Sequence, residues 1–398
     1  MTTRPVWAEI SKRNLIANYR ALCALATPNA DLLAVVKANA YGHGVLDCGT
    51  QLVEAGAEWL GVTCVEEAVE IRAACPQARI LVMSGVWRGE ADAVLKHTLT
   101  PVIWEQFHLD LLEAAALRVG LGPQSVPVFL EIDTGMSRQG VRVTLPHSAG
   151  DGNAELSKIL GRFHTGSPLR LEGIMTHFSA PEVLDDSATD SQIEAFKEAL
   201  LVTRSLGLTP RWVSAGNSAT LIAGKDLPIL KAVADSIGSR LLLRPGLALY
   251  GYPPRFTGDV AEISGYQPVL AWKSRVTSLR TIKPGETAGY NSTFRAHRPT
   301  RLALLPCGYA DGVSRLLSNR GSVLIRGQRA PIAGRVSMDQ TIIDVTDVTG
   351  IEIGDEVVLI GTQGDHSITA YDIADQMGTI PYEVLCSISH RVLRILVD

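Results

Sequence analysis

With 398 residues the chain exceeds one ordinary domain, and its 41 acidic and 37 basic residues are mixed along it, giving a formal charge of −4. We expect no nucleic-acid partner, because binding a phosphate backbone needs a basic tract that this sequence lacks. No segment approaches the run of about 20 apolar residues that spans a bilayer, and residues 1–10 lack the apolar core of a secretory signal, which predicts a cytoplasmic protein without a membrane partner. The six scattered cysteines form no metal-ligand pattern, so no metal site is expected.

Short apolar runs recur through the first 250 residues and predict eight strands. They lie at 32–36, 59–62, 80–83, 101–104, 126–132, 173–176, 212–214 and 241–243. Stretches with helical periodicity separate most of them, such as 192–205, which opens with a capping box from Ser191 to Glu194 and closes at Gly207. Apolar strands that alternate with helices predict an α/β fold, a (β/α)8 TIM-like barrel, with a doubly wound open sheet as the alternative.

After Tyr252 the pattern changes to alternating segments punctuated by turns, which predicts a mainly β domain. The expected strands lie at 271–277, 301–305, 322–325, 341–345 and 356–360, and a short amphipathic helix is expected at 370–377. We therefore assign 1–252 to the barrel and 253–398 to the β domain, leaving it open whether the first ten residues join the β domain.

Lys37 follows the first apolar run and precedes a Gly-rich turn, where burial can lower the pKa of a lysine and free its lone pair for an aldehyde cofactor. In a barrel the chemistry lies at the carboxyl ends of the strands. The polar residues that follow other strands are therefore expected on the same face, although any one of them alone could be an ordinary loop residue. They are Arg138, His177, Asn217, Ser218 and Arg244, with Tyr41 after the first strand.

Several motifs, found in order across both predicted domains, give the chain a strong resemblance to a known family. They are 7–10, 36–44, 133–136, 176–178, 216–219, 244–246, 308–312, 334–340 and 381–384. With these segments the chain resembles the alanine racemases, fold-type III enzymes that use pyridoxal 5′-phosphate (PLP). The resemblance implies interconversion of L-alanine and D-alanine, supplying D-alanine for peptidoglycan.

The resemblance also implies roles for individual residues. Lys37 would bind PLP covalently, His177 would pack against the pyridine ring, and Arg138 would donate near the phenolic oxygen and to the substrate. Arg244 would face the pyridine nitrogen, where a guanidinium can only donate. The phosphate would be held by Tyr41, Ser218, Tyr382 and the backbone N–H groups after Arg244, at Gly246 and Leu247, and Asn217 would also belong to the cofactor site.

Inverting a Cα requires proton donors and acceptors on both faces of the substrate, so a second group must stand opposite Lys37. The resemblance assigns this role to Tyr290, delivered from a partner subunit, and so implies a homodimer with shared active sites. Met338 and Asp339 would reach the substrate carboxylate, and Tyr309 would narrow the entrance. The alternative for Tyr290 is an ordinary sheet tyrosine.

Glu131 stands where many members of the family have a carbamylated lysine, an anion that holds the arginine corresponding to Arg138. A glutamate supplies a carboxylate directly, but its side chain is about 3 to 4 Å shorter. We expect Glu131 to be buried and held against Arg138, with a shift of Arg138, a water or an ion taking up the difference.

Other readings remain open at this point. A decarboxylase of the same cofactor class would place an acidic residue at the pyridine nitrogen, which Arg244 argues against. A non-catalytic PLP-binding barrel would not need the segment 267–398. Serine or a broad range of amino acids are alternative substrates, since an apolar pocket rejects one added hydroxyl only about 100-fold. Whether the role is biosynthetic or catabolic is also open.

Overall fold

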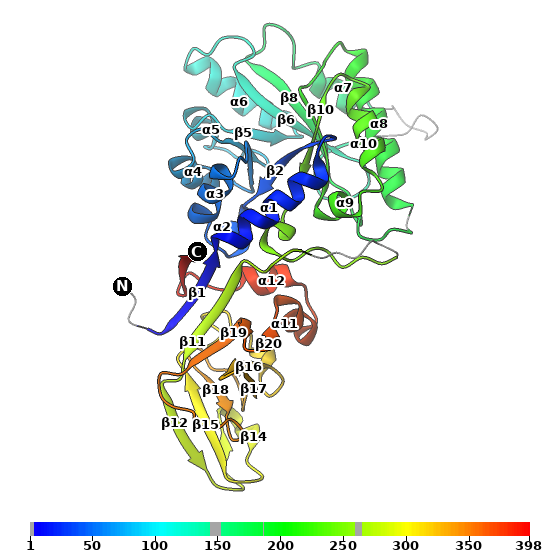
Figure 1. Cartoon of the computed structure of the whole chain (residues 1–398). Coiled ribbons are helices and arrows are strands. Elements are labelled where there is room, and N and C mark those ends of the chain that lie inside the picture. The colour runs from blue at the N-terminus through cyan, green and yellow to red at the C-terminus, as the bar shows by residue number, and fades with distance from the viewer. Residues whose placement is uncertain (1–3, 144–152, 186, 259–264) are drawn as a thin grey trace. The chain divides into compact units, whose positions relative to one another are not determined.

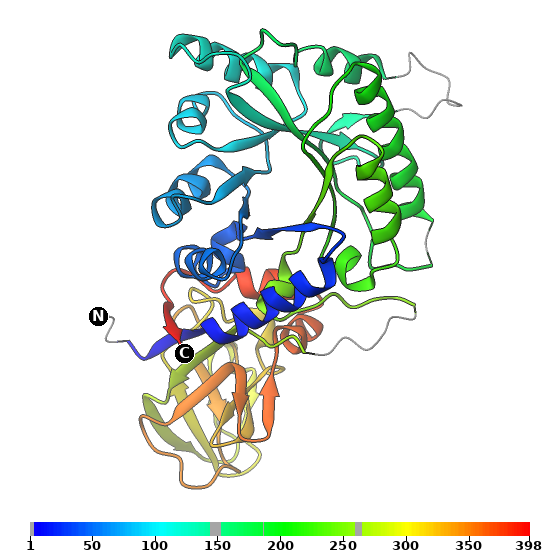
Figure 2. The same ribbon diagram turned by 45° about the horizontal axis from the view of Figure 1, so that its top comes forward.

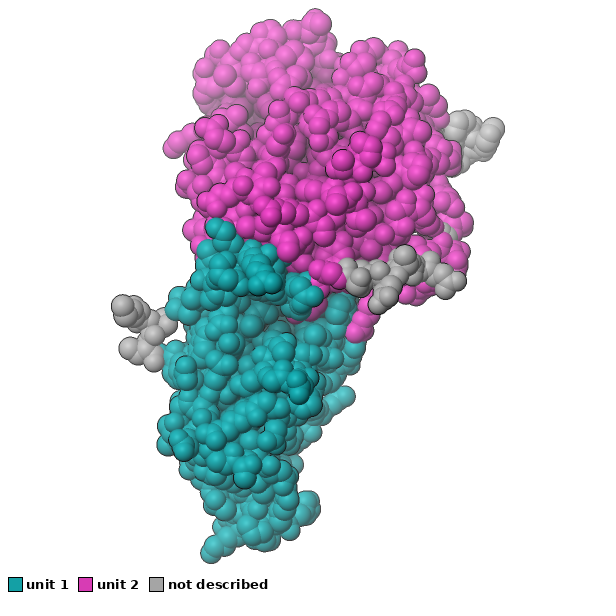
Figure 3. Space-filling view, viewed as in Figure 1, with its two compact units in different colours: residues 1–14, 41–44, 267–398 teal, residues 15–40, 45–266 magenta. Residues whose placement is uncertain are grey.

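The structure is a computed structural model that describes residues 4–143, 153–185, 187–258 and 265–398. Its contacts form two compact units, which Figure 3 shows in teal and magenta. The β unit comprises Met1–Asn14, Tyr41–Gly44 and Gln267–Asp398, and the barrel unit comprises Leu15–Ala40 and Val45–Tyr266. The domain boundary expected between 252 and 253 remains a prediction. None of the helices in the described part of the chain has the length and apolar composition that crossing a membrane requires.

The barrel unit contains a closed ring of eight parallel strands (Figures 1 and 2). In chain order they are β2 (Asp31–Val35), β3 (Trp59–Val62), β4 (Arg79–Val82), β5 (Thr100–Ile103), β6 (Val126–Asp133), β8 (Leu169–Thr176), β9 (Trp212–Asn217) and β10 (Arg240–Arg244). β5 pairs with β4 on one side and with β6 on the other, which closes the ring. The predicted barrel is confirmed, and the open sheet is excluded because it would need two free edges. A two-residue strand, β7 (Val141–Arg142), is added beside β6.

Helices follow most strands and lie outside the ring (Figure 2). They are α1 (Lys12–Ala26), α2 (Lys37–Tyr41), α3 (Val45–Glu54), α4 (Val65–Ala74), α5 (Ala91–Lys96), α6 (Gln106–Arg118), α7 (Ala154–Leu160), α8 (Ala188–Ser205), α9 (Ser218–Ala223), α10 (Leu227–Asp235) and η1 (Leu247–Tyr250). The predicted capping box is wrong, because α8 begins at Ala188 and Ser191 lies inside it. Thr189 is already buried, so the buried face of the helix begins before the start that the Ser-x-x-Glu pattern indicates. The predicted end of the helix at Gly207 is confirmed, since Gly207 adopts a left-handed φ of 74° just beyond the helix.

Large aromatic side chains pack inside the barrel near the first residues of its strands. Trp59 and Trp212 each open a strand, are 1% exposed, and meet edge to face with ring centroids 6.0 Å apart. Phe129 packs edge-on against Trp59 at 5.7 Å. Burying each ring stabilises the fold by roughly 2–3 kcal/mol. The contact also explains Gly173, where an added Cβ would lie 2.4 Å from Phe129 Cε1.

The β unit is built on three sheets. A seven-stranded sheet has the order β17-β16-β19-β11-β1-β21 with β20 on β19, a second sheet has the order β12-β15-β18, and β13 pairs with β14. The strands are β1 (Val6–Ser11), β11 (Leu270–Arg275), β12 (Ser278–Ile282), β13 (Thr287–Ala288), β14 (Phe294–Arg295), β15 (Thr300–Leu305), β16 (Ser322–Ile325), β17 (Gln328–Pro331), β18 (Thr341–Asp344), β19 (Glu356–Gln363), β20 (His366–Ile368) and β21 (Leu393–Val397). β1 lies between β11 and β21, so the N-terminal strand belongs to this sheet.

The helical segments of the β unit are short. They are α11 (Ala370–Met377), α12 (Pro381–Cys386), η2 (Tyr290–Ser292) and η3 (Arg315–Leu317). The predicted helix at 370–377 is confirmed, and it opens with a reciprocal cap in which the Thr369 hydroxyl accepts from the Asp372 N–H while the Asp372 carboxylate accepts from the Thr369 N–H.

Candidate active site

Lys37 opens a turn with unusual backbone geometry. Ala38, Asn39 and Ala40 have φ between 52 and 54° and ψ between 48 and 51°, which makes this turn a left-handed helix built from residues other than glycine. Each such residue costs about 1 kcal/mol or more, because its Cβ crowds the backbone. The surroundings must therefore hold the turn, and backbone strain of this kind is concentrated at functional sites.

Two side chains tie the left-handed turn to the rest of the barrel unit. Glu67 on α4 accepts from Ala38 N at 2.7 Å with one carboxylate oxygen and from Thr63 N at 2.8 Å with the other. Asn39 Oδ1 accepts from Val45 N at 2.7 Å. Glu67 thus fixes the first residue after Lys37, a role that the sequence did not indicate.

Arg244, the last residue of β10, is buried at 4% exposure in the barrel unit. It donates to Ser214 Oγ at 2.6 Å and to the Thr176 carbonyl at 2.7 Å, and its Nη2 lies 3.3 Å from His177 Nδ1. Burial lowers the pKa of Arg244 to about 10, with the charge of Arg138 acting in the same direction and that of Glu131 against it. The guanidinium therefore remains protonated at neutral pH and acts only as a donor.

His177 is held as a neutral imidazole. Burial, followed by the charges of Arg244, Arg138 and Lys37, lowers the pKa of His177 to about 3. Because a guanidinium can only donate, Nδ1 is the acceptor facing Arg244 and the ring proton lies on Nε2. Arg244 lies against the ring at 3.3 Å, and the charges of Arg138 and Lys37 act on His177 as well, in the same direction.

The predicted phosphate-binding residues of the barrel unit also come together. Asn217 caps α9, its Oδ1 accepting from Ala219 N at 2.8 Å. Ser218 follows it, and Ser218 Oγ accepts from Gly246 N at 3.0 Å. Leu247 follows Gly246 and opens η1. A hydroxyl and the backbone of two loops therefore meet beside Arg244, which ends β10.

Glu131, on β6, is 2% exposed, and its carboxylate does not meet Arg138. Gln139 Nε2 donates to Glu131 Oε2 at 2.6 Å and lies 3.0 Å from the Met83 carbonyl. Arg138 is exposed, and among the described residues it forms no hydrogen bond or ion pair with Glu131. Glu131 is therefore buried as expected, but its contact in the described part of the chain is the amide of Gln139, which was not among the expected ways of bridging the distance to Arg138.

The charge of Glu131 nevertheless acts on the arginines of the site. Burial raises the pKa of Glu131, while the Gln139 hydrogen bond and the charges of Arg244 and Arg138 oppose that rise. The carboxylate and the two guanidinium groups are thus coupled electrostatically without a direct contact to Arg138.

In the β unit, Tyr41 and Tyr382 lie together. Their ring centroids are 5.8 Å apart at an interplanar angle of 50°, and burial raises the pKa of Tyr41 above its usual range. The turn that follows Tyr41 requires glycine, since a Cβ on Gly42 would lie 2.3 Å from the Leu385 carbonyl oxygen. Arg394 also donates to the Gly42 carbonyl at 2.8 and 3.0 Å. Two predicted phosphate ligands are thus neighbours within one unit.

Three loops of the β unit gather the other predicted residues. Tyr309 N donates to the Ser337 carbonyl at 3.0 Å, which joins the loop of Tyr309 to that of Met338. A Cβ on Gly334 would lie 2.6 Å from the carbonyl of Ala288, so the same loop packs on the segment that leads to Tyr290. The side chains of Tyr290, Tyr309 and Met338 are 69%, 44% and 53% exposed.

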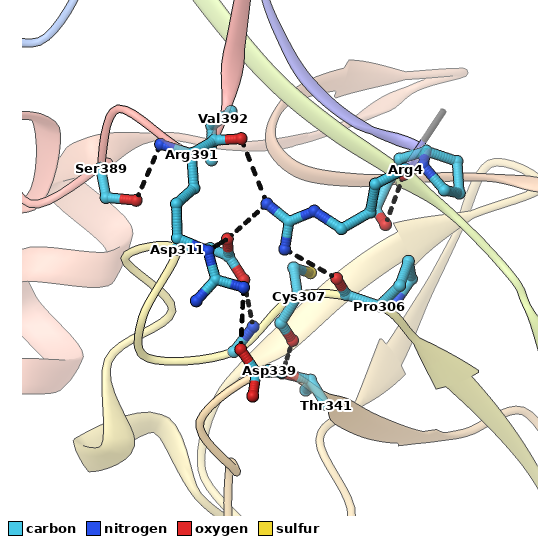
Figure 4. Close-up of polar contacts among 12 residues, drawn as sticks. Arg4, Pro306, Cys307, Asp311, Asp339, Thr341, Ser389, Arg391 and Val392 are labelled. Atoms are coloured by element: carbon cyan, nitrogen blue, oxygen red, sulfur yellow. Dashed lines mark hydrogen bonds and ion pairs between the residues drawn. The ribbon is translucent and has the colours of Figure 1, made fainter. Parts of the chain in front are cut away.

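A charge network centred on the buried Asp311 holds Asp339 beside these loops (Figure 4). Asp311 is fully buried and pairs with Arg4 at 2.6 Å and Arg391 at 3.4 Å, while its second oxygen accepts from Gly308 N at 3.0 Å. Arg391 continues the chain of contacts to Asp339 Oδ1 at 2.8 Å. Asp311 therefore fixes both the loop that leads to Tyr309 and the partner of Asp339, a role that the sequence did not indicate.

Two protein-family models match the chain. A model described as "Alanine racemase, N-terminal domain" matches residues 10–254, and one described as "Alanine racemase, C-terminal domain" matches 269–396. The chain belongs to the alanine racemase family. Its relatives include the alanine racemases of Halothermothrix orenii, 38% identical over 98% of this chain and 97% of that protein, and of Sorangium cellulosum, 39% identical over 98% of each.

Solved alanine racemases have the same fold. The enzyme from E. faecalis superposes with a TM-score of 0.85 at 31% identity, covering 99% of this chain and 98% of that one. The alanine racemase from Bartonella henselae with covalently bound pyridoxal phosphate gives 0.82 at 30% identity and covers 99% of each chain. The predictions of family, fold, enzyme class and cofactor are confirmed, and the roles of individual residues remain predictions.

The barrel residues fit PLP on chemical grounds. The cofactor is an aromatic aldehyde that carries a phosphate dianion, and this site offers an amine at Lys37, a neutral flat ring at His177 and a donor-only cation at Arg244. Ser218 Oγ and the Gly246 backbone, 3.0 Å apart, supply the polar contacts that a phosphate needs.

Proposed function

We propose that this enzyme interconverts L-alanine and D-alanine with PLP by a two-base mechanism that uses Lys37 and Tyr290 of the partner subunit. When bound, PLP supplies the electron sink that makes the substrate Cα proton acidic. The observation that carries the proposal is the buried Arg244 guanidinium, whose Nη2 lies 3.3 Å from Nδ1 of the neutral His177 imidazole.

The roles of the barrel residues follow from their chemistry. Lys37, fixed by the left-handed turn, would exchange the Cα proton on one face of the substrate. Arg244 is held by Ser214 and Thr176, and as a guanidinium it cannot give up a proton to the pyridine nitrogen. Leaving that nitrogen unprotonated weakens the sink and favours return of the proton to Cα over competing chemistry.

The second base would come from another copy of the chain, because the candidate residues of the β unit are unusually exposed. Tyr290, Tyr309 and Met338 present aromatic and thioether surface on adjoining loops, and such surface is typical of protein interfaces. We therefore propose a homodimer in which the Tyr290 hydroxyl of one subunit serves the opposite face of the substrate bound by the other. Asp339 and Met338 would orient the substrate carboxylate.

Complementation tests this arrangement directly. Lys37→Ala and Tyr290→Phe chains should each fail to convert L-alanine into D-alanine, whereas a hybrid dimer retains one site with both groups intact. An equal mixture after subunit exchange should recover about a quarter of the wild-type activity, because half of the dimers are hybrid and each has one working site. Tyr266→Phe, which removes a hydroxyl elsewhere, should remain active. If hybrids were demonstrated and no activity returned, the shared site would be rejected.

Alanine is the proposed substrate, and D-alanine for peptidoglycan the proposed physiological product. Tyr309 and Tyr382 supply aromatic surface that suits a methyl side chain. The kcat/KM values for alanine, serine, lysine and arginine measure this preference, and equal values for alanine and arginine would contradict it.

We further propose that Glu131 supplies the negative charge that a carbamylated lysine supplies in many family members. Its burial, its hydrogen bond to Gln139 and its electrostatic coupling to Arg244 and Arg138 support this role. No carbon dioxide would then be needed to complete the site.

A further inference from the structure

A second site of the barrel unit lies at the end opposite the candidate active site. A hollow of about 680 Å³ is lined by residues at the beginnings of strands, among them Trp59, Arg79 and Thr100, the first residues of β3, β4 and β5. By contrast, His177 follows β8 and Arg244 ends β10. In a parallel barrel all strands run in one direction, so the two sets of residues are separated by the length of the strands. We call the hollow the basal cavity.

The basal cavity concentrates positive charge. Five of the described residues that line it are arginine or lysine, namely Arg72, Arg79, Lys96, Arg170 and Arg211. Glu172 is the acidic residue among the described lining residues. This excess contrasts with the formal charge of −4 of the whole chain. Gathering like charges around a concave surface is unfavourable unless an anion offsets them.

Two of these cations donate their hydrogen bonds to acceptors of the protein itself. Arg72 donates to the carbonyls of Ala78 at 2.6 Å and His97 at 2.9 Å, so its guanidinium braces the loops around it. Arg170 pairs with Glu172 at 3.0 Å and donates to a backbone carbonyl at 2.8 Å. We therefore assign both a structural role.

The other three cations keep donors that no hydrogen bond to the described part of the protein uses. Within the described part of the chain, Lys96 and Arg211 make no side-chain hydrogen bond, and Arg79 has only a 3.7 Å ion pair to Glu172. Indole rings hold the two arginines in place instead. Arg79 stacks over Trp59 at 5.4 Å and Arg211 over Trp212 at 5.3 Å, and stacking leaves the edge of each guanidinium able to donate.

We propose that the basal cavity binds a small polyanion that carries two or more phosphate or carboxylate groups. A planar guanidinium matches either group with two parallel hydrogen bonds, and Lys96 adds a point charge. Three cations around one hollow offer donors for more than one anionic group, and the volume lies within the range of small-ligand sites. The sequence has no basic tract outside this hollow to follow a nucleic acid, which favours a small ligand.

The test uses the PLP-loaded enzyme, so that the phosphate site at the other end of the barrel is filled. Inorganic tripolyphosphate and citrate are titrated by calorimetry at constant ionic strength. We expect one tripolyphosphate per chain, with an affinity that Arg211→Gln and Lys96→Gln each weaken about tenfold. The matched control is Arg240→Gln, whose guanidinium stacks on the same Trp212 ring at 4.8 Å but does not line the cavity. This control should bind as tightly as the wild type.

The outcomes separate the possible sources of the anion. Tripolyphosphate binding without citrate binding supports a phosphorylated ligand, and binding of both supports any compact polyanion. Absence of binding by either probe overturns the proposal, as does an equal loss in Arg211→Gln and Arg240→Gln, which would indicate a general charge effect. Tighter, Arg211-dependent binding of a 20-base-pair DNA duplex would overturn the small ligand in favour of a nucleic-acid surface. The absorbance of bound PLP, unchanged throughout, shows that the probes do not displace the cofactor.

Discussion

The Glu131 carboxylate and the Gln139 side-chain amide are joined by a 2.6 Å hydrogen bond within the barrel unit. Gln139 Nε2 also lies 3.0 Å from the carbonyl of Met83, so the amide is anchored from a second direction. A neutral donor holds the carboxylate in place without cancelling its charge. The negative charge of Glu131 thus remains able to act on Arg244 and Arg138.

Removing that charge while keeping the shape tests the proposed replacement of the carbamate. Glu131→Gln should weaken PLP binding, shift the cofactor absorbance and lower turnover, because Arg244 and Arg138 lose their counter-charge. Activity of the native enzyme should not respond to added bicarbonate. Cofactor titration and steady-state kinetics measure both effects, with Glu194→Gln, an exposed surface glutamate, as the control. An unchanged spectrum, affinity and turnover in Glu131→Gln would make Glu131 merely structural.

Glu67 is predicted to matter for the cofactor although it belongs to a helix beside the site. Glu67→Ala removes the acceptor of two backbone N–H groups, those of Ala38 and Thr63. The left-handed turn after Lys37 should then relax, and PLP occupancy should fall. The PLP occupancy of Glu67→Gln should lie between those of the wild type and Glu67→Ala, because an amide offers only one acceptor oxygen.

Urea unfolding and the absorbance of bound PLP measure the two effects of Glu67. The control is Glu70→Gln on the exposed side of the same helix, which should change neither quantity. If Glu67→Ala lost stability while binding PLP as tightly as the wild type, the turn would not depend on Glu67.

The barrel was predictable because its strands are buried on both faces and therefore form nearly continuous apolar runs. All eight predicted runs overlap strands of the ring, with ends that differ by a few residues. In the β unit the predicted runs correspond to β11, β15, β16, β18 and β19, whereas β12, β17 and β21 were missed, and β13, β14 and β20, of two or three residues, are too short to show a period. Pairing across a sheet, and not the local sequence, creates such strands.

The sequence predicted some residues of the site and not their contacts. The residue that follows each strand is a local property of the sequence, so Lys37, His177 and Arg244 could be named. Their partners depend on tertiary contacts, and neither Glu67 nor Arg391 carries a local sign of its role. The segment Ala38–Ala40 has ordinary helix-forming residues, and only the surrounding hydrogen bonds select the left-handed form.

His177 predicts a specific dependence of stability on pH. Its pKa is about 3 in the folded chain and near 6.5 when unfolded, so between these values the unfolded chain takes up a proton that the folded chain refuses. The contribution of neutral His177 to the free energy of unfolding is complete above pH 6.5. It is lost as the pH falls below that value, by roughly 1.4 kcal/mol per pH unit. From pH 7 to pH 5, His177→Phe should therefore lose about 2 kcal/mol less stability than the wild type.

Urea unfolding at several pH values measures this difference with PLP bound to both proteins. Burial also lowers the pKa of His108, to about 4, and His108 is present in both proteins. The slope of the free energy of unfolding against pH is therefore compared between the wild type and His177→Phe. Identical slopes would contradict a neutral, buried His177.

Asp311 is predicted to act on substrate handling through the loops of the β unit. Asp311→Asn removes the buried carboxylate that pairs with the partly exposed Arg4 and Arg391, so both side chains are held less firmly. The loop of Tyr309 and the position of Asp339 should loosen, so KM for alanine should rise and kcat/KM should fall. The affinity for PLP should change little, because Lys37 and the cofactor residues of the barrel unit are untouched.

Asp347→Asn, which removes an exposed partner of Arg298, should leave stability and kinetics as in the wild type. A loss of PLP affinity as large as the loss of kcat/KM would show that Asp311 supports the whole fold and not the substrate loops.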